Sequence, residues 1–432
     1  MPAARELDAP QAYLSEAPNR VQIDAMPQNT DESRPLLLRG ARVVTPAGAL
    51  ERAAVLVRAG RVARIIRDGE SADIDDGESA DSSGPTALDL DGLTLLPGFI
   101  DVHIHGSVGV DTMEASPDDL HRVALFLAEN GVTSWLPTLV PAPVEDYSRA
   151  VGSIGQLMRV QDALPTAARA VGLHYEGPFV NTQQCGALRT AYFRTFKGAS
   201  DLDELPVLEE EGAAHMITLA PEVEGGIELV RELAARGWVV SIGHTRAGVP
   251  ALEGARRAGA RHMTHFLNAM SPLHQRAPGP VGWGLLQDDV TVDLIADRIH
   301  SDPLALRLVL RCKTAARVSL ISDEVAPAGL GDGEYKVWGE TIRVSEGRTS
   351  NERGHIAGSV ITMLDAVRTA ASLGLSETDL ARVASLNPAR LLGIDGDRGS
   401  IETGKRADLA ALDAGGRVRL TLVGGRVAFD KL

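Results

Sequence analysis

An alternation of short apolar runs and longer amphipathic runs fills residues 98–324 and constrains the fold more than any other feature. Eight apolar runs have the length and composition of strands, and most are continuously apolar, as expected of strands that are covered on both faces. These runs are GFIDVHIH, TSWLPTLV, AVGLHYEG, HMITLAPE, WVVSIGHT, RHMTHFLN, VTVDLIAD and RVSLISDE. Many of the runs between them, such as DDLHRVALFLAENG and DPLALRLVLRCK, have the period of an amphipathic helix.

Eight β/α units of this size predict an α/β protein with a TIM (β/α)8 barrel. A doubly wound open sheet is the competing architecture. No GxGxxG motif follows the first strand, which weakens this alternative.

Both ends of the chain have a different sequence pattern, in which short strand-like runs are separated by Gly and Pro. We therefore predict a small β-sandwich-like domain formed by residues 35–96 and 395–432, with the catalytic barrel inserted over residues 97–394. Residues 1–34 lack a sustained period and are predicted to form a disordered leader. The acidic motif DGESAD occurs twice within residues 68–81 and predicts a solvated hairpin loop, because the spacing of an EF-hand calcium loop is missing.

Charge and cysteine usage exclude several classes of protein. The formal net charge of −15 would repel phosphates, so nucleic-acid binding is not expected. Cys185 and Cys312 have no paired spacing, which indicates a reducing compartment. Neither a transmembrane run nor a signal-peptide pattern is present, so we expect a cytoplasmic protein without membrane contact.

Titratable residues recur at the C-terminal ends of the predicted strands, where TIM-barrel active sites lie. The first strand ends on His103 and His105, which share one face because they are two residues apart. At or just after the ends of later strands stand Glu176, His244, His265, His300 and Asp323.

Each of these residues, taken alone, has a structural interpretation: a histidine can be hydrogen-bonded, and Glu176 or Asp323 can cap a turn or a helix. As a set they would be costly to bury around one axis without compensation. A divalent cation removes that cost, since imidazole nitrogen and carboxylate oxygen are ligands that Zn²⁺ and similar ions prefer. The set therefore predicts a metal centre at the barrel mouth.

The remaining histidines carry weaker signals. His174 shares a face with Glu176 and is a candidate for a supporting role, and His274 stays ambiguous beside Arg276 in a loop. The histidines in helical, pre-strand or loop contexts are interpreted as structural: His121, His215, His262 and His355.

A series of motifs resembles a known family. LPGFIDVHIHG after a β-domain is similar to the amidohydrolase superfamily. Within that superfamily, the chain from about residue 36 to 430 resembles the N-acetylglucosamine-6-phosphate deacetylases. The motifs are GLHYEGPFVN, ITLAPE, SIGHTRAG, THFLNAMSPLHQRAPGPVG, IADRIHSD, ISDEVAPAG, IAGSVITM and NPARLLG.

The resemblance implies metal-dependent hydrolysis of the N-acetyl group of N-acetylglucosamine 6-phosphate, with glucosamine 6-phosphate and acetate as products. It implies one or two divalent ions, Zn²⁺ first, with Fe, Co or Mn as alternatives. The implied main ligands are Glu176, His244 and His265. His103 and His105 match the pair that holds a second ion in binuclear members.

The resemblance also implies roles in catalysis and substrate binding. Asp323 matches the catalytic aspartate, and Arg276 and His300 match contacts to the sugar phosphate. Asn268 and Ala269 match a loop that lines the sugar pocket. The arginine can reach the neighbouring subunit in this family, which implies a homodimer around a phosphorylated amino-sugar substrate.

One stretch departs from the family pattern. The family usually has Lys-Gly-Ala-His after EGPF, and that histidine is thought to polarise the scissile carbonyl, whereas this chain has Cys-Gly-Ala-Leu and ends on Leu188. Leucine cannot donate a hydrogen bond. Either another donor, such as His174 or Arg189, replaces it, or the metal supplies all of the polarisation, or the substrate differs.

Alternative functions stay open from the sequence. N-acetylgalactosamine 6-phosphate, an unphosphorylated N-acetyl sugar, a cyclic amide or an N-acyl-D-amino acid could be the substrate. The cyclic-amidase class is disfavoured because no lysine stands at a strand end in place of Glu176. A non-enzymatic scaffold would be expected to lose ligands, and all of them are present.

Overall fold

The computed structural model describes residues 34–70 and 85–432. The predicted leader and most of the acidic repeat therefore lie outside the described residues. Within the described part of the chain, no helix is both long and apolar enough to cross a lipid bilayer.

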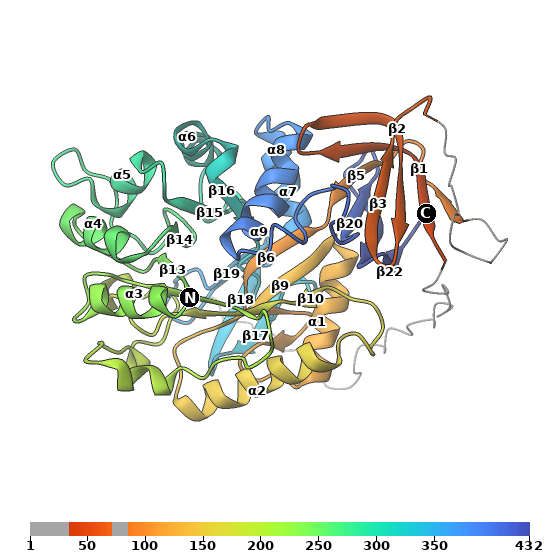
Figure 1. Ribbon diagram of the computed structural model, residues 1–432. Helices are drawn as coiled ribbons and strands as arrows, with labels where there is room; N and C mark the ends of the chain where they lie inside the picture. The colour runs from red at the N-terminus through yellow and green to blue at the C-terminus, as the bar shows by residue number, and fades with distance from the viewer. Residues whose placement is uncertain (1–33, 71–84) are drawn as a thin grey trace, which may run out of the picture. The chain divides into compact units, whose positions relative to one another are not determined.

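Eight parallel strands form a nearly closed barrel, which confirms the predicted fold class (Figure 1). The strands follow chain order around the barrel, from β6 next to β9 through to β16. The His103 carbonyl, on β6, accepts a hydrogen bond of 3.0 Å from the backbone N–H of Asp323, which follows β16. The barrel strands are β6 (Phe99–Ile104), β9 (Val132–Leu139), β11 (Gly172–Glu176), β12 (Ala214–Leu219), β13 (Val239–Ile242), β14 (His262–Met263), β15 (Thr291–Ile295) and β16 (Val318–Ile321), and β10 (Arg169–Ala170) extends the sheet beside β9.

Helices follow most of the strands, and local signals set where they begin. The first helix starts at a capping box in which Ser116 and Asp119 satisfy each other's backbone N–H groups, with Pro117 at its first position. Thr362 and Asp365 form the same motif later in the chain. The helices are α1 (Pro117–Glu129), α2 (Val144–Val160), α3 (Gly226–Ala235), α4 (Val249–Ala258), α5 (Gly279–Leu286), α6 (Pro303–Lys313), α7 (Met363–Ser372), α8 (Glu377–Ala381) and α9 (Asn387–Leu391).

Three connections depart from a regular β/α unit. Between β6 and α1 the chain forms a two-stranded sheet of β7 (Gly106–Ser107) and β8 (Val110–Asp111). After β11 the chain forms three short 3₁₀ turns in place of an α-helix: η1 (Thr182–Gln184), η2 (Thr190–Tyr192) and η3 (Ala199–Glu204). Between β16 and α7 lies an antiparallel sheet that the sequence reading had not predicted: β17 (Gly333–Val337), β18 (Glu340–Ser345) and β19 (Arg348–Ser350). Its strands are short and partly exposed, so they lack the long apolar runs that identify the barrel strands.

The two ends of the chain meet in one sheet, with the strand order β22-β21-β20-β5-β1-β2-β3 and β4 paired to β1. An apolar core that includes Leu38, Val55, Leu95, Leu409 and Leu422 holds it together. The exact boundaries of the two predicted domains stay a prediction. The strands are β1 (Leu36–Thr45), β2 (Gly48–Arg58), β3 (Arg61–Ile66), β4 (Thr86–Asp89), β5 (Thr94–Pro97), β20 (Leu409–Leu412), β21 (Val418–Val423) and β22 (Arg426–Asp430).

Candidate metal centre

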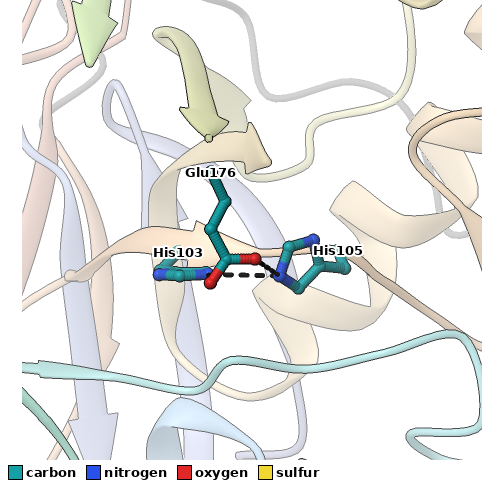
Figure 2. A group of neighbouring side chains, drawn as sticks. All are labelled: His103, His105 and Glu176. Atoms are coloured by element: carbon teal, nitrogen blue, oxygen red, sulfur yellow. Dashed lines mark hydrogen bonds and ion pairs between the residues drawn. The ribbon is translucent and has the colours of Figure 1, made fainter. Parts of the chain in front are cut away.

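Three of the predicted ligands come from two barrel strands and meet at the barrel mouth (Figure 2). His103 lies on β6 and His105 directly follows it, and their Nε2 atoms are 3.1 Å apart. Glu176 is the last residue of β11, and its carboxylate points between the two imidazoles. Its oxygens lie 3.6 Å from the His103 Nε2 atom and 3.4 Å from the His105 Nε2 atom.

Two further imidazoles contact the same carboxylate. His244 follows β13 and His265 follows β14, and each Nε2 atom is 2.9 Å from the Glu176 Oε1 atom. The Nε2 atoms of His244 and His265 are 3.1 Å apart. Glu176 is therefore shared by two groups of three, one with His103 and His105 and one with His244 and His265.

Asp323 completes the cluster. Its Oδ1 atom lies 3.5 Å from the His103 Nε2 atom and 3.4 Å from the His105 Nε2 atom. The side chains of this cluster are at most 9% exposed. The barrel thus buries two carboxylates and four imidazoles at one point.

The backbone at this end of the barrel is held in an unfavourable conformation. His244, His265 and Asp323 have φ values of 45°, 32° and 52°, in the left-handed region that non-glycine residues rarely occupy. Such conformations cost about 1–3 kcal/mol each and persist where the surrounding structure enforces them, commonly at functional sites. All three strained residues belong to the cluster: His244 and His265 contact Glu176, and Asp323 contacts His103 and His105.

Burial and the two carboxylates shift the pKa values of the titratable groups in this cluster. Burial alone would lower the pKa of His105, but hydrogen bonds to Asp323 and Glu176 outweigh it and raise the pKa to about 10. Burial also acts to lower the pKa of His265, but the hydrogen bond and the charge of Glu176 outweigh it and raise the pKa to about 9. Burial holds the pKa of His103 well below its usual range. Burial would raise the pKa of Glu176, but the surrounding imidazoles hold it well below its usual range.

The spacing of the ligand atoms fits a bound cation. Ligand atoms about 2.05 Å from a zinc ion lie about 2.9–3.4 Å apart when they subtend angles of about 90–109° at the ion. The Nε2 pairs at 3.1 Å and the separations of 2.9 Å between Glu176 Oε1 and the Nε2 atoms of His244 and His265 fall within this range. The Glu176 oxygens lie at or just beyond its upper limit from His103 and His105, at 3.6 and 3.4 Å. The two carboxylates supply the negative charge that a divalent ion requires, so the residues present fit such an ion.

Hydrogen bonds to groups outside the cluster fix the orientation of the His244 ring and the backbone of His265. The Nδ1–H of His244 donates to the Gln184 carbonyl at 2.7 Å. The Asp293 carboxylate accepts a hydrogen bond from the His265 backbone N–H and lies 2.9 Å from the His262 Nε2 atom. Neither Gln184 nor Asp293 was predicted to contribute, although Asp293 stands in a strand that is otherwise apolar and could have been noticed for that reason.

His174 is fully engaged by protein groups. Its Nδ1–H donates to the Val102 carbonyl at 3.1 Å, and its Nε2 atom accepts from the Thr218 hydroxyl at 2.8 Å. Thr264 and Ser241 continue this chain of hydrogen bonds in the barrel interior. Burial lowers the pKa of His174 to about 3, so the ring is neutral. It therefore has no hydrogen left for a substrate carbonyl.

The predicted substrate residues fall into two groups. Asn268 and Ala269 stand three and four residues after His265, and the buried Asn268 Nδ2 group has no partner among the described residues. His300 is oriented by Asp297, whose Oδ2 atom lies 2.6 Å from its Nδ1 atom.

The other two predicted residues make no side-chain hydrogen bond or ion pair with the ligand residues in the described part of the chain. Arg276 is exposed, and among the described residues no hydrogen bond or ion pair joins its side chain to the ligand cluster formed by His103, His105, Glu176, His244, His265 and Asp323. Leu188 is 3% exposed and packs in the main apolar core. The predicted donor Arg189 keeps a buried Nε atom that has no partner in the described part of the chain, and its guanidinium lies 4.8 Å from the centre of the Tyr192 ring.

Comparison with known proteins shows which family this chain matches. Residues 94–428 match the amidohydrolase family. The N-acetylglucosamine-6-phosphate deacetylase of Bacillus subtilis (strain 168) is 38% identical over 339 residues, which cover 78% of this chain and 84% of that protein. The N-acetylgalactosamine-6-phosphate deacetylase of Escherichia coli O157:H7 is also 38% identical over 339 residues, covering 78% and 88% of the two chains.

Solved structures agree with these sequence matches. The N-acetylglucosamine-6-phosphate deacetylase from Pasteurella multocida has a TM-score of 0.81 and 28% identity, covering 91% of this chain and 99% of that one. A mutant of the Mycobacterium smegmatis deacetylase, solved in complex with N-acetyl-D-glucosamine-6-phosphate, has a TM-score of 0.79 and 29% identity at the same coverage.

Proposed function

The chain belongs to the amidohydrolase family, and from this premise we propose that it hydrolyses the N-acetyl group of N-acetylglucosamine 6-phosphate. The products are glucosamine 6-phosphate and acetate. The observation that carries the proposal is the placement of the Glu176 carboxylate among four imidazoles, with Asp323 beside them. The relatives that carry this activity by name match most of the chain, so the likeness extends well beyond the ligand residues.

We propose Zn²⁺ as the cation, with Fe, Co or Mn as alternatives, because the ligand set of histidine and carboxylate suits all of them. Glu176, His244 and His265 would hold one ion. His103, His105 and Glu176 would hold a second, with Glu176 shared between them. A bound ion of this kind polarises a carbonyl and lowers the pKa of water from about 15.7 to about 7.

Asp323 would act as the general base and then as the general acid. Its carboxylate reaches the same point as the ligand nitrogens, so it can take a proton from the attacking water and later donate it to the leaving amine. Its backbone is fixed by the hydrogen bond to the His103 carbonyl, which holds the carboxylate in place between the two events.

The sugar and its phosphate would be held by residues outside the ligand cluster. The unpartnered amide of Asn268 offers a donor beside His265, and Ala269 lies next to it. Arg276 and His300 would bind the phosphate and so orient the acetamide. Because Arg276 is exposed and no hydrogen bond or ion pair among the described residues joins its side chain to the ligands of its own chain, we propose a homodimer in which it reaches the neighbouring site.

We propose a cytoplasmic location on the basis of cysteine chemistry. Cys185 and Cys312 are both free, as expected of a protein kept in a reducing compartment.

N-acetylgalactosamine 6-phosphate is the second candidate substrate. The relative from Escherichia coli O157:H7 that bears this activity in its name is as similar to this chain, at 38% identity, as the Bacillus subtilis deacetylase. The ligand cluster acts on the acetamide and does not distinguish the two sugars.

Acetate release from a panel of amino sugars tests the proposal. The panel contains N-acetylglucosamine and N-acetylgalactosamine, each with and without a 6-phosphate, and metal content is measured on the same protein. We expect the highest kcat/KM for N-acetylglucosamine 6-phosphate and a stoichiometric divalent ion. A preference for the galactosamine epimer would select the second candidate, and no acetate release with any sugar would refute both.

A further inference from the structure

A tryptophan stands at the tip of the unpredicted hairpin between β17 and β18. Val337 pairs with Glu340, so Trp338 and Gly339 form a two-residue turn, with φ values of 53° and 76°. Positive φ at both positions is the geometry of a type I′ turn, which favours Asn-Gly and penalises a bulky side chain at the first position. A tryptophan in such a strained turn suggests the hypothesis that its side chain has a function that offsets the strain.

The indole of Trp338 lies against a candidate metal ligand. Its ring meets the His105 ring edge-on, with 5.3 Å between centroids and an interplanar angle of 83°. The indole Nε1–H is buried and has no hydrogen-bond partner among the described residues. A buried donor that stays unpaired costs about 1–3 kcal/mol, so this group calls for an acceptor that the protein itself does not supply.

The hairpin is also joined to the segment that departs from the family pattern. Trp338 and Ala187 pack on the same apolar cluster, which contains Ala326 and Val337. The guanidinium of Arg353 donates to the Ala187 carbonyl at 2.8 Å and lies 3.7 Å from the Glu340 carboxylate. The indole is therefore held beside the segment 185–188 and beside the ligand cluster at once.

Leu188 leaves the site without the side-chain donor that the family resemblance leads one to expect. It is buried in the apolar core and offers no hydrogen-bonding group. Of the two substitutes suggested by the sequence, His174 is fully engaged by Val102 and Thr218. The other, Arg189, lies over the Tyr192 ring and keeps a buried Nε atom without a partner among the described residues, so it stays a second candidate for part of this role.

We propose that Trp338 contacts the substrate and that its Nε1–H donates a hydrogen bond to the oxygen of the scissile acyl group. This donor takes over part of the carbonyl polarisation that Leu188 cannot provide. The inference rests on the proposed deacetylase function and assigns a residue to it. No bond is made or broken at the indole; the hydrogen bond strengthens as negative charge develops on the oxygen.

Trp338→Phe tests the proposal, because it keeps an aromatic ring at the tip of the hairpin and removes only the N–H. Loss of one such donor commonly lowers kcat by about 10²–10³-fold. We expect a fall of about 10²-fold in kcat with N-acetylglucosamine 6-phosphate, a KM within about threefold of wild type, and unchanged metal content. Trp238→Phe is the matched control, since Trp238 stacks on Tyr175 and precedes β13, at the opposite end of the strand from His244.

A second substrate separates polarisation from a structural role. The N-trifluoroacetyl analogue has a more reactive carbonyl and depends less on a hydrogen-bond donor, so the loss caused by Trp338→Phe should shrink several-fold with it. Equal losses with both substrates, or a Trp338→Phe variant within threefold of wild type, would overturn the assignment while leaving the deacetylase function intact. Wild-type protein that releases no acetate from any sugar would overturn both.

Discussion

The sheet formed by the chain ends and the mouth of the barrel are built on opposite principles. The sheet formed by the two chain ends has a core cluster made of apolar residues, such as Leu38 and Leu409. The mouth of the barrel buries two carboxylates and four imidazoles within a few ångströms of one another. One region is stabilised by removing apolar surface from water, and the other collects groups whose burial is costly without a compensating charge.

The contrast separates what holds the protein together from what it does. The barrel mouth also contains backbone strain at three positions, which the rest of the barrel must offset. The chain-end sheet has no member of the ligand cluster among its described residues. Changes at the barrel mouth should therefore alter chemistry more than stability, and changes in the chain-end sheet should do the reverse.

The sharpest separation is expected from Asp323→Asn. The amide has nearly the same shape but cannot act as a base, so acetate release should fall by about 10³-fold or more, equivalent to about 4 kcal/mol. Metal content and the midpoint of thermal unfolding should stay close to wild type, as measured on the same preparation. A variant with near-normal turnover would show that another residue moves the proton.

Leu38→Ala should give the opposite result. This side chain is fully buried in β1, and its truncation removes apolar contacts and leaves a cavity. The free energy of unfolding should fall by about 3 kcal/mol, while kcat/KM at a permissive temperature stays within about twofold of wild type. Denaturant unfolding and acetate release measure the two quantities. A large loss of activity in folded protein would mean that the two regions are coupled.

A chelator should lower the free energy of unfolding, because it removes the ion that we propose at the barrel mouth. An ion present at about 100 times its dissociation constant contributes about 2.7 kcal/mol, and the histidine and carboxylate charges would be left uncompensated without it. Thermal unfolding with and without chelator measures the effect, and re-addition of Zn²⁺ should reverse it. The same decrease is expected in wild type and in Leu38→Ala; identical melting curves before and after chelation would argue against a bound ion.

Arg276→Ala should have the smallest effect. The side chain is exposed, so stability should not change. KM for the phosphorylated sugar should rise about tenfold, equivalent to about 1.4 kcal/mol, with little change for the unphosphorylated sugar. Arg311→Ala on the exposed face of α6 is the matched control. Equal changes in KM for both sugars would remove the phosphate role.

Most of the barrel could be predicted because burial on both faces leaves a local signal. Each of the eight apolar runs overlaps a barrel strand, and the polar residues at their ends could be read directly. The three-stranded sheet over residues 333–350 was missed because its strands are short and half exposed. The 3₁₀ turns after β11 give no periodic signal at all.

The sequence by itself determined which residue types stand at the strand ends, since a strand's period and its last residue are local properties. Only the tertiary structure decided which of them meet: Glu176 and His265 are 89 positions apart and touch because the barrel closes. It also decided that His174 is engaged, that Leu188 turns into the core, and that Trp338 lies on His105. The reason is physical, because contacts between distant segments depend on how strands and hairpins pack, and no local pattern encodes that.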